Sequence, residues 1–134
     1  MPKKFTAATA DKYVLYQRAV QSADQDVDFL IDTYKELRGR KPRHFREDFC
    51  GTCLLSSHWV QANKNNTAEA YDIDPEPLTW GLKNNIKPLG KKAKRLTQYQ
   101  EDARNPSRQA PDVRCAQNFS YWVFKKRTEM LDYF

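Results

Sequence analysis

Apolar residues recur at helical spacing in the first third of the chain. Between Ser22 and Gly39 they occupy positions i, i+3, i+4, i+7 and i+10, filled by Val27, Leu30, Ile31, Tyr34 and Leu37. This spacing predicts an amphipathic helix, and Gly39 supplies its stop. Residues 11–20 also have helical composition. Two helices are therefore expected before the first strand.

After Gly39, short strand-like runs alternate with helical stretches. Strands are expected at residues 44–49, 68–72, 94–99 and 113–118, and helices at residues 53–63, 75–85 and 124–134. Residues 102–111 contain two prolines and are expected to form a loop. This alternation favours an α/β fold with a parallel sheet and right-handed crossovers. We interpret residues 1–134 as one domain, with residues 1–40 as a helical lead or lid and residues 41–134 as the βα units.

Two strand ends carry carboxylates at a spacing that favours nucleoside binding. The first strand ends in Glu47 and Asp48 and runs into a turn at Gly51, and Asp72 ends the second strand 21 residues later. A small-residue turn brings backbone N–H groups close to a ligand, and an aspartate at the second strand end accepts hydrogen bonds from ribose hydroxyls. We assign Asp72 to the ribose and Asp74 to the cap of the helix that Pro75 begins. The alternative is that Asp72 only caps that helix.

The turn departs from the dinucleotide-binding fingerprint, which needs three glycines. Gly51 is the one glycine present, and Phe49 and Cys53 fill the neighbouring slots. A pyrophosphate pressed against the backbone is therefore not expected. A nucleoside without phosphates tolerates the bulkier turn.

Four segments together resemble the motifs of class I S-adenosylmethionine-dependent methyltransferases. They are residues 47–56, 70–75, 101–104 and 112–121, in the order found in that family. The resemblance implies that Glu47 faces the amino-acid end of S-adenosylmethionine, Asp72 the ribose hydroxyls, and Asp102 the adenine amino group. The cofactor-binding set that it implies is Glu47, Phe49, Cys50, Gly51, Asp72, Ile73, Asp102, Ala103, Asn118 and Phe119.

The fourth motif places polar and aromatic residues at a strand end, where ligands bind in open α/β sheets. We expect Asn118 and Tyr121 to orient the acceptor nucleophile, as the catalytic pair, and Phe119 or Trp122 to pack against the adenine or the sulfonium. The structural alternative is that Asn118 or Ser120 caps the next helix and the aromatic residues belong to the core.

The resemblance implies a Rossmann-like sheet of about four strands in the order 3-2-1-4. The family fold has seven strands, so this chain is interpreted as its cofactor-binding half. The implied reaction is the transfer of a methyl group to an acceptor that is a small molecule or is unknown. Strand four would then be an exposed edge, through which a homodimer could form. A non-catalytic nucleoside-binding or interaction module is the alternative.

The three cysteines favour a reducing compartment rather than a disulfide framework. Cys50 and Cys53 nevertheless spell C-x-x-C at a strand-to-helix turn, as in thiol–disulfide redox proteins. We favour this alternative less, because a central redox strand should be apolar and this one contains Arg46, Glu47 and Asp48. Zinc is favoured less still, because no second cysteine or histidine pair completes four ligands.

Composition favours a cytoplasmic protein with no membrane segment. Hydrophobic residues make up 40% of the chain and charged residues 30%, with a formal net charge of +6, and the mean hydropathy is −0.89. A basic cluster raises the possibility of a nucleic-acid partner, and it consists of Lys83, Lys87, Lys91, Lys92, Lys94 and Arg95. A solvated helix face with its loop is the interpretation we favour for this cluster.

Overall fold

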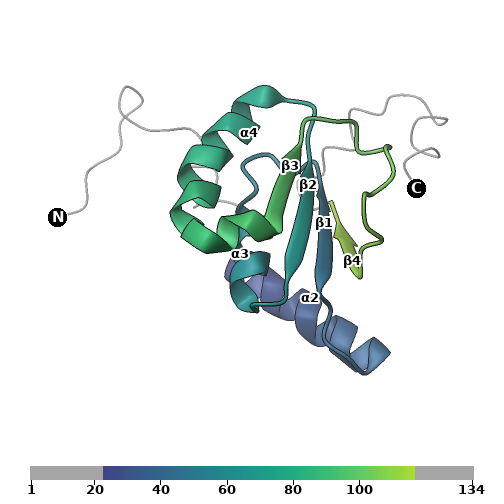
Figure 1. Cartoon of the computed structure of the whole chain (residues 1–134). Coiled ribbons are helices and arrows are strands. Elements are labelled where there is room, and N and C mark those ends of the chain that lie inside the picture. Colours follow the sequence, from purple (N-terminus) through teal and green to yellow (C-terminus); the bar gives the residue numbers. More distant parts are fainter. Residues whose placement is uncertain (1–22, 117–134) are drawn as a thin grey trace.

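The computed structural model describes residues 23–116 (Figure 1). Its helices are α2 (Ala23–Arg38), α3 (Leu54–Ala62) and α4 (Pro75–Gly81), followed by a π-helical turn η1 (Leu82–Ile86) and a 3₁₀ segment η2 (Lys87–Arg95). Its strands are β1 (His44–Asp48), β2 (Thr67–Tyr71), β3 (Leu96–Tyr99) and β4 (Val113–Cys115). The helices predicted at residues 11–20 and 124–134 lie outside the described residues.

The four strands form one parallel sheet in the order β3-β2-β1-β4, which confirms the predicted topology. Asp48 at the end of β1 pairs with Tyr71 at the end of β2, and Tyr71 pairs in turn with Tyr99 of β3. The loops that leave these strands therefore start side by side at the carboxyl edge of the sheet. This edge is where open α/β sheets bind ligands.

Most predicted boundaries agree with the structure to within two residues. The helix before the sheet ends at Arg38, and Gly39 follows with a φ of +72°, its N–H bonded to the Lys35 carbonyl at 2.9 Å. The third strand begins at Leu96 rather than residue 94, because the preceding basic residues complete η2. Residues 102–111 form a loop, as predicted. In the described part of the chain no helix is long and apolar enough to cross a membrane.

One face of the sheet is mainly apolar, with Glu47 as its buried charged residue, and is covered by helices. Phe45, Ala68 and Ala70 belong to the buried core, and the ring of Phe45 stacks on Trp59 of α3 with centroids 4.8 Å apart. Figure 1 shows α3 and α4 on this side of the sheet. Burial of these side chains is the main source of stability for the described domain.

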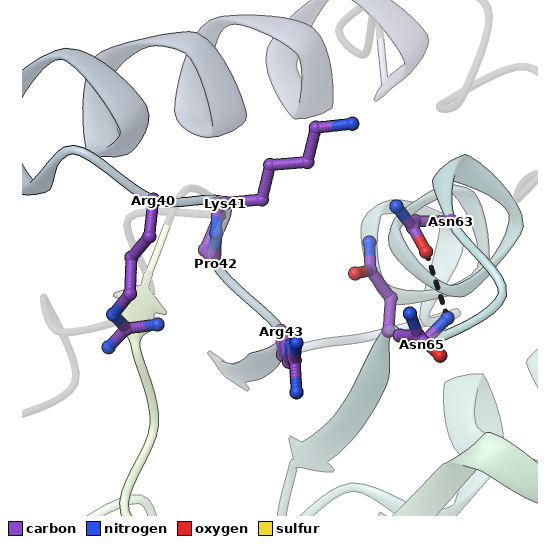
Figure 2. Close-up of a pocket in the computed structure, with 7 residues that line it drawn as sticks. Arg40, Lys41, Pro42, Arg43, Asn63 and Asn65 are labelled. Atoms are coloured by element: carbon purple, nitrogen blue, oxygen red, sulfur yellow. Dashed lines mark hydrogen bonds between the residues drawn. The ribbon is translucent and has the colours of Figure 1, made fainter.

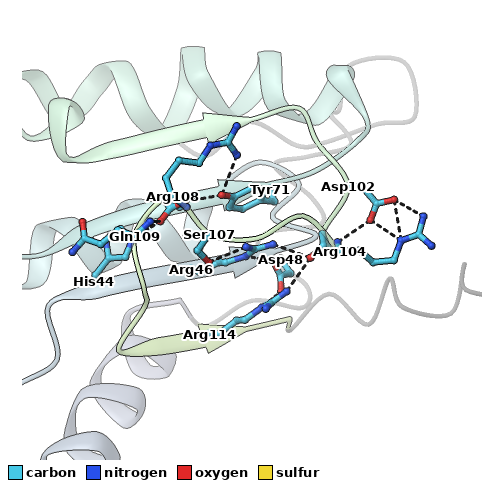
Figure 3. A network of polar contacts seen from close by, with 12 residues as sticks. His44, Arg46, Asp48, Tyr71, Asp102, Arg104, Ser107, Arg108, Gln109 and Arg114 are labelled. Carbon is cyan, nitrogen blue, oxygen red and sulfur yellow. Dashed lines mark hydrogen bonds and ion pairs between the residues drawn. The ribbon is translucent and has the colours of Figure 1, made fainter. Parts of the chain in front are cut away.

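The other face of the sheet is charged, although strands of a parallel sheet are usually apolar on both faces. Arg46 is fully buried and donates to Asp48 at 2.8 Å and to the Ala103 carbonyl at 2.8 Å. Its guanidinium also lies 3.8 Å from the centroid of the Tyr71 ring, and Arg114 donates to Asp48 at 2.6 Å. The loop between β3 and β4 supplies the partners of this face (Figure 3).

A second group of polar contacts on the charged face is centred on Glu69. It accepts hydrogen bonds from the Tyr71 hydroxyl at 2.6 Å, from the backbone N–H groups of Arg108 and Gln109, and from the ring of His44. Burial alone would raise the pKa of Glu69, but these bonds outweigh it and lower the pKa to about 2. The ring of His44 thus has a structural role, because it holds Glu69 and also contacts the Thr67 hydroxyl.

Candidate functional site

The loop that follows β1 holds three residues with a positive φ. Phe49, Gly51 and Cys53 have φ values of 54°, 54° and 62°. Left-handed φ costs a residue with a side chain roughly 1–2 kcal/mol. Phe49 and Cys53 therefore adopt a backbone conformation that favours glycine, and the packing of Cys53 in the core helps to hold it there.

The two thiols of this loop are buried and close to each other. Cys50 and Cys53 are free cysteines whose sulfur atoms lie 3.3 Å apart. Burial, together with the neighbouring thiol of Cys53, raises the pKa of Cys50 well above its ordinary value. A redox-active thiol needs the opposite shift. The redox alternative therefore gains no support from the geometry.

Glu47 lies beneath the loop, on the helix-covered face of the sheet. Its Oε1 accepts hydrogen bonds from the Ser56 hydroxyl at 2.6 Å and from the Ser56 N–H at 3.2 Å. Burial raises the pKa of Glu47, and although these two hydrogen bonds lower it, the resulting pKa is about 7. Ser56, in the first turns of α3, was not among the predicted site residues, although it lies within the first motif. Its role as the anchor of Glu47 is visible only in the structure.

Asp72 connects the end of β2 to the loop after β1. Its Oδ2 accepts from the Gly51 N–H at 2.9 Å, and its Oδ1 accepts from the Asp74 N–H at 3.0 Å. The cap of α4 is Asp74, whose side chain accepts from the Glu76 N–H at 3.0 Å. The predicted capping role of Asp74 is thus confirmed, and the alternative that Asp72 is the cap is wrong.

A small cleft opens at the carboxyl edge of β1, β2 and β3. It is lined by Phe49, Tyr71, Asp72, Ile73, Glu101, Asp102 and Ala103. Five of these residues belong to the predicted cofactor set, and Tyr71 and Glu101 were missed by it. Ile73 is 64% exposed, which leaves an apolar surface beside the cleft. Cys50 does not line the cleft, because its side chain is directed into the core.

The carboxylate of Asp102 is already engaged by an arginine. Arg104 donates from Nη2 to Asp102 Oδ2 at 2.7 Å, from Nε to both oxygens, and from its backbone N–H to Oδ1 at 2.8 Å (Figure 3). The hydrogen bonds from Arg104 lower the pKa of Asp102. Asp102 thus lines the cleft as an ionised acceptor with a competing partner.

Some predicted residues lie outside the described part of the chain. These are Asn118, Phe119 and Tyr121 of the fourth motif, together with Trp122. Within residues 23–116, no group of three or more His, Cys, Asp or Glu side chains is arranged to hold a metal ion. The site described here consists of the loop after β1, the two strand-end carboxylates and the cleft between them.

No family model matches the chain, and neither does any curated protein sequence. Solved structures do match. CalS10, an amino pentose methyltransferase from Micromonospora echinaspora with bound S-adenosylmethionine, superposes with a TM-score of 0.71 at 13% sequence identity over 99% of this chain. The chain has the class I methyltransferase fold. The plantazolicin methyltransferase BpumL in complex with S-adenosylhomocysteine shares this methyltransferase fold, with a TM-score of 0.67 at 15% identity over 90% of the chain.

The sugar N-methyltransferase KedS8 from a Streptoalloteichus species also shares the methyltransferase fold, with a TM-score of 0.67 at 16% identity over 99% of the chain. The chain spans about half of each of these proteins, namely 50% of CalS10, 45% of BpumL and 50% of KedS8. At such low identity the likeness establishes the methyltransferase fold alone.

Proposed function

We propose that this chain binds S-adenosylmethionine at the carboxyl edge of its sheet and forms the cofactor-binding part of a methyltransferase. The observation that carries the proposal is the convergence of the left-handed loop, the Asp72 carboxylate and the cleft at one edge of the sheet. Support also comes from the S-adenosylmethionine and S-adenosylhomocysteine bound to structures of the same fold.

Five residues that line the cleft are proposed to contact the nucleoside. Asp72 accepts hydrogen bonds from the two ribose hydroxyls, since a carboxylate can accept several at once. Ile73 and Phe49 provide apolar surface for the adenine ring, and Asp102 accepts a hydrogen bond from its amino group. The Ala103 backbone completes this wall of the cleft.

Glu47 is proposed to hold the ammonium group at the amino-acid end. Its Oε1 is bonded to Ser56, and its second carboxylate oxygen is the acceptor offered to the ligand. Cys50 and Gly51 contribute backbone between Glu47 and the cleft. An ion pair in this buried position is stronger than one on the surface, because water screens it less.

When bound, S-adenosylmethionine supplies a methyl group on a sulfonium that is already a good leaving group, so the protein has little acid–base work to do. The residues of the chain align the reactants and exclude water. We propose Asn118 and Tyr121 as the pair that orients a small-molecule acceptor. Two of the three similar structures are named for acceptors of this class, an amino pentose and a sugar.

Calorimetric titration with S-adenosylhomocysteine tests the cofactor site. Asp72→Ala is expected to weaken binding by about 30-fold or more, because it removes charge-assisted hydrogen bonds worth roughly 2 kcal/mol. Asp74→Ala is the matched control: it removes the same charge two residues away and costs about 1 kcal/mol of stability through the α4 cap, while binding stays near wild type. Equal binding by wild type and Asp72→Ala, or no binding by a folded wild-type chain, would contradict the proposal.

Arg104→Ala is expected to tighten S-adenosylhomocysteine binding by roughly 2- to 5-fold. The adenine amino group must displace the guanidinium from Asp102, and a half-exposed ion pair of this kind is worth about 1 kcal/mol at most. The same titration measures the effect, with Asp102→Ala as the variant that loses the acceptor altogether. Weaker binding by Arg104→Ala would mean that the arginine itself contacts the ligand.

A further inference from the structure

A second pocket lies at the opposite, amino edge of the sheet. It has a volume of about 410 Å³ and lies between the segment that joins α2 to β1 and the turn that follows α3 (Figure 2). Its lining residues are Arg40, Lys41, Pro42, Arg43, Asn63, Asn65 and Asn66. The strands start at this edge, so the pocket is separate from the cleft proposed for the cofactor.

The first wall of the pocket is held in place by Asp112. This carboxylate accepts from the backbone N–H groups of Arg43 at 2.8 Å and His44 at 3.2 Å, and from Arg40 Nη2 at 3.0 Å. Burial alone would raise the pKa of Asp112, but these bonds lower it to about 2. Arg40 is therefore neutralised by a permanent charge, and the backbone beside it is fixed.

Arg43 is fixed from its other side as well. Its carbonyl accepts from the indole N–H of Trp59 at 3.2 Å and from the Thr67 N–H at 2.9 Å. Within residues 23–116, neither the Lys41 nor the Arg43 side chain forms an ion pair or hydrogen bond. The wall thus presents two cations without a carboxylate partner in the described structure.

The second wall is an asparagine turn held by Arg95. The Nη1 atom of Arg95 donates to the carbonyls of Asn63 at 2.8 Å and Asn66 at 2.7 Å. The Asn65 N–H bonds to the Asn63 side chain at 2.9 Å, and Asn66 donates its amide to the Trp59 carbonyl. The backbone of both walls is thus held in place before any ligand binds, which lowers the entropic cost of binding.

We propose that this pocket binds a phosphate group. Guanidinium and ammonium groups are the side chains that bind phosphate, and the amide of Asn65 adds a neutral donor. No carboxylate is among the pocket's lining residues to repel an anion. The inference goes beyond the proposed function and does not depend on it, because the pocket lies at the other edge of the sheet.

The field around the pocket favours the same ligand. Residues 77–100 contain no acidic residue, and their basic residues are Lys83, Lys87, Lys91, Lys92, Lys94 and Arg95. The last of these basic residues, Arg95, holds the asparagine turn of the second wall in place. Clustered positive charge attracts phosphates over about 10 Å at moderate salt. A phosphodiester chain and a free phosphate or phosphate monoester are the two sources of the group.

Fluorescence anisotropy with a labelled single-stranded oligonucleotide of about 12 nucleotides tests the proposal. The double variant Lys41→Ala/Arg43→Ala is expected to weaken binding at least 10-fold and to reduce the slope of log K against log salt by about 1 to 2. The charge-matched control is Lys83→Ala/Lys87→Ala, whose residues lie outside the pocket lining; it is expected to weaken binding less than 3-fold. Thermal melts establish that both variants are folded.

Competition with inorganic phosphate and tripolyphosphate distinguishes the sources. Displacement of the oligonucleotide at low millimolar phosphate indicates a site for a free phosphate or monoester, whereas resistance to both competitors indicates a phosphodiester chain. Either result supports the proposal if it depends on Lys41 and Arg43. Equal losses of affinity in the two double variants would overturn the proposal, because binding would then depend only on the net positive charge of the protein. Failure of all three probes to bind would overturn it as well.

Discussion

Replacing Glu47 with glutamine is expected to raise the free energy of unfolding of the ligand-free protein at pH 8 by about 2 kcal/mol. Glu47 is buried with a pKa near 7 rather than 4.5, so its ionised form is destabilised in the folded protein. Glutamine has nearly the same shape and can accept the same hydrogen bonds from Ser56, but it carries no charge. Urea denaturation at pH 8 measures the difference.

The pH dependence of stability provides the control for this prediction. Between pH 4.5 and 7 the folded protein keeps the Glu47 proton that the unfolded chain releases, so this residue makes stability fall as the pH rises through that range and level off above it. The Glu47→Gln variant is expected to lack this decline. A variant that is less stable than wild type at pH 8 would contradict the buried-charge argument.

The same substitution is expected to weaken S-adenosylhomocysteine binding at pH 8 by at least 10-fold, if the proposed function holds. The ligand's ammonium group prefers the ionised carboxylate, so wild-type affinity should rise between pH 6 and pH 8 while that of the variant stays flat. Stability and binding would thus change in opposite directions at one residue. Such opposition is expected where a buried charge is kept for binding.

Gly81→Ala is expected to destabilise the protein by about 3 kcal/mol and to displace the loop after β1. A Cβ atom at Gly81 would lie 2.2 Å from the Thr52 carbonyl oxygen and 2.6 Å from its carbon, and both are backbone atoms that cannot rotate away. Gly81 has ordinary helical φ and ψ, so the requirement is for space rather than for backbone freedom. The last turn of α4 must therefore move, together with Thr52.

Gly39→Ala is the matched control for this substitution. Gly39 has a φ of +72°, and a Cβ there would meet no atom within 4 Å. Gly39→Ala is therefore expected to lower the free energy of unfolding by only about 1 kcal/mol, because alanine is disfavoured in the left-handed backbone region. Urea denaturation of both variants measures the costs. A Gly81→Ala protein as stable as Gly39→Ala would show that the loop after β1 yields easily.

Local patterns in the sequence were sufficient to predict the sheet and much of the cleft. The alternation of strands and helices, with the resemblance of the four motifs, predicted the order that Phe45, Ala68 and Leu96 confirm by their register. Phe49 and Cys53 looked like departures from a glycine motif. The structure shows them in the left-handed conformation instead, because tertiary packing can override the preference of a residue for its backbone region.

The charged face of the sheet could not be predicted in the same way. Arg46 and Glu69 are buried because partners from residues 103–109 bond to them, and a contact between residues so far apart leaves no local signature. Gly81 did leave a local signature in the sequence, since a single glycine inside a helical stretch indicates close packing. Its contact with Thr52 nevertheless required coordinates.

The charged face also affects how stability varies with temperature. Exposure of apolar surface raises the heat capacity of unfolding, whereas exposure of polar surface lowers it. One side of this sheet buries Arg46, Asp48 and Glu69 where most parallel sheets bury aliphatic side chains. We expect a heat capacity change below the usual value of about 12–15 cal/mol/K per residue, and hence a broad, shallow stability curve that resists cooling as well as heating.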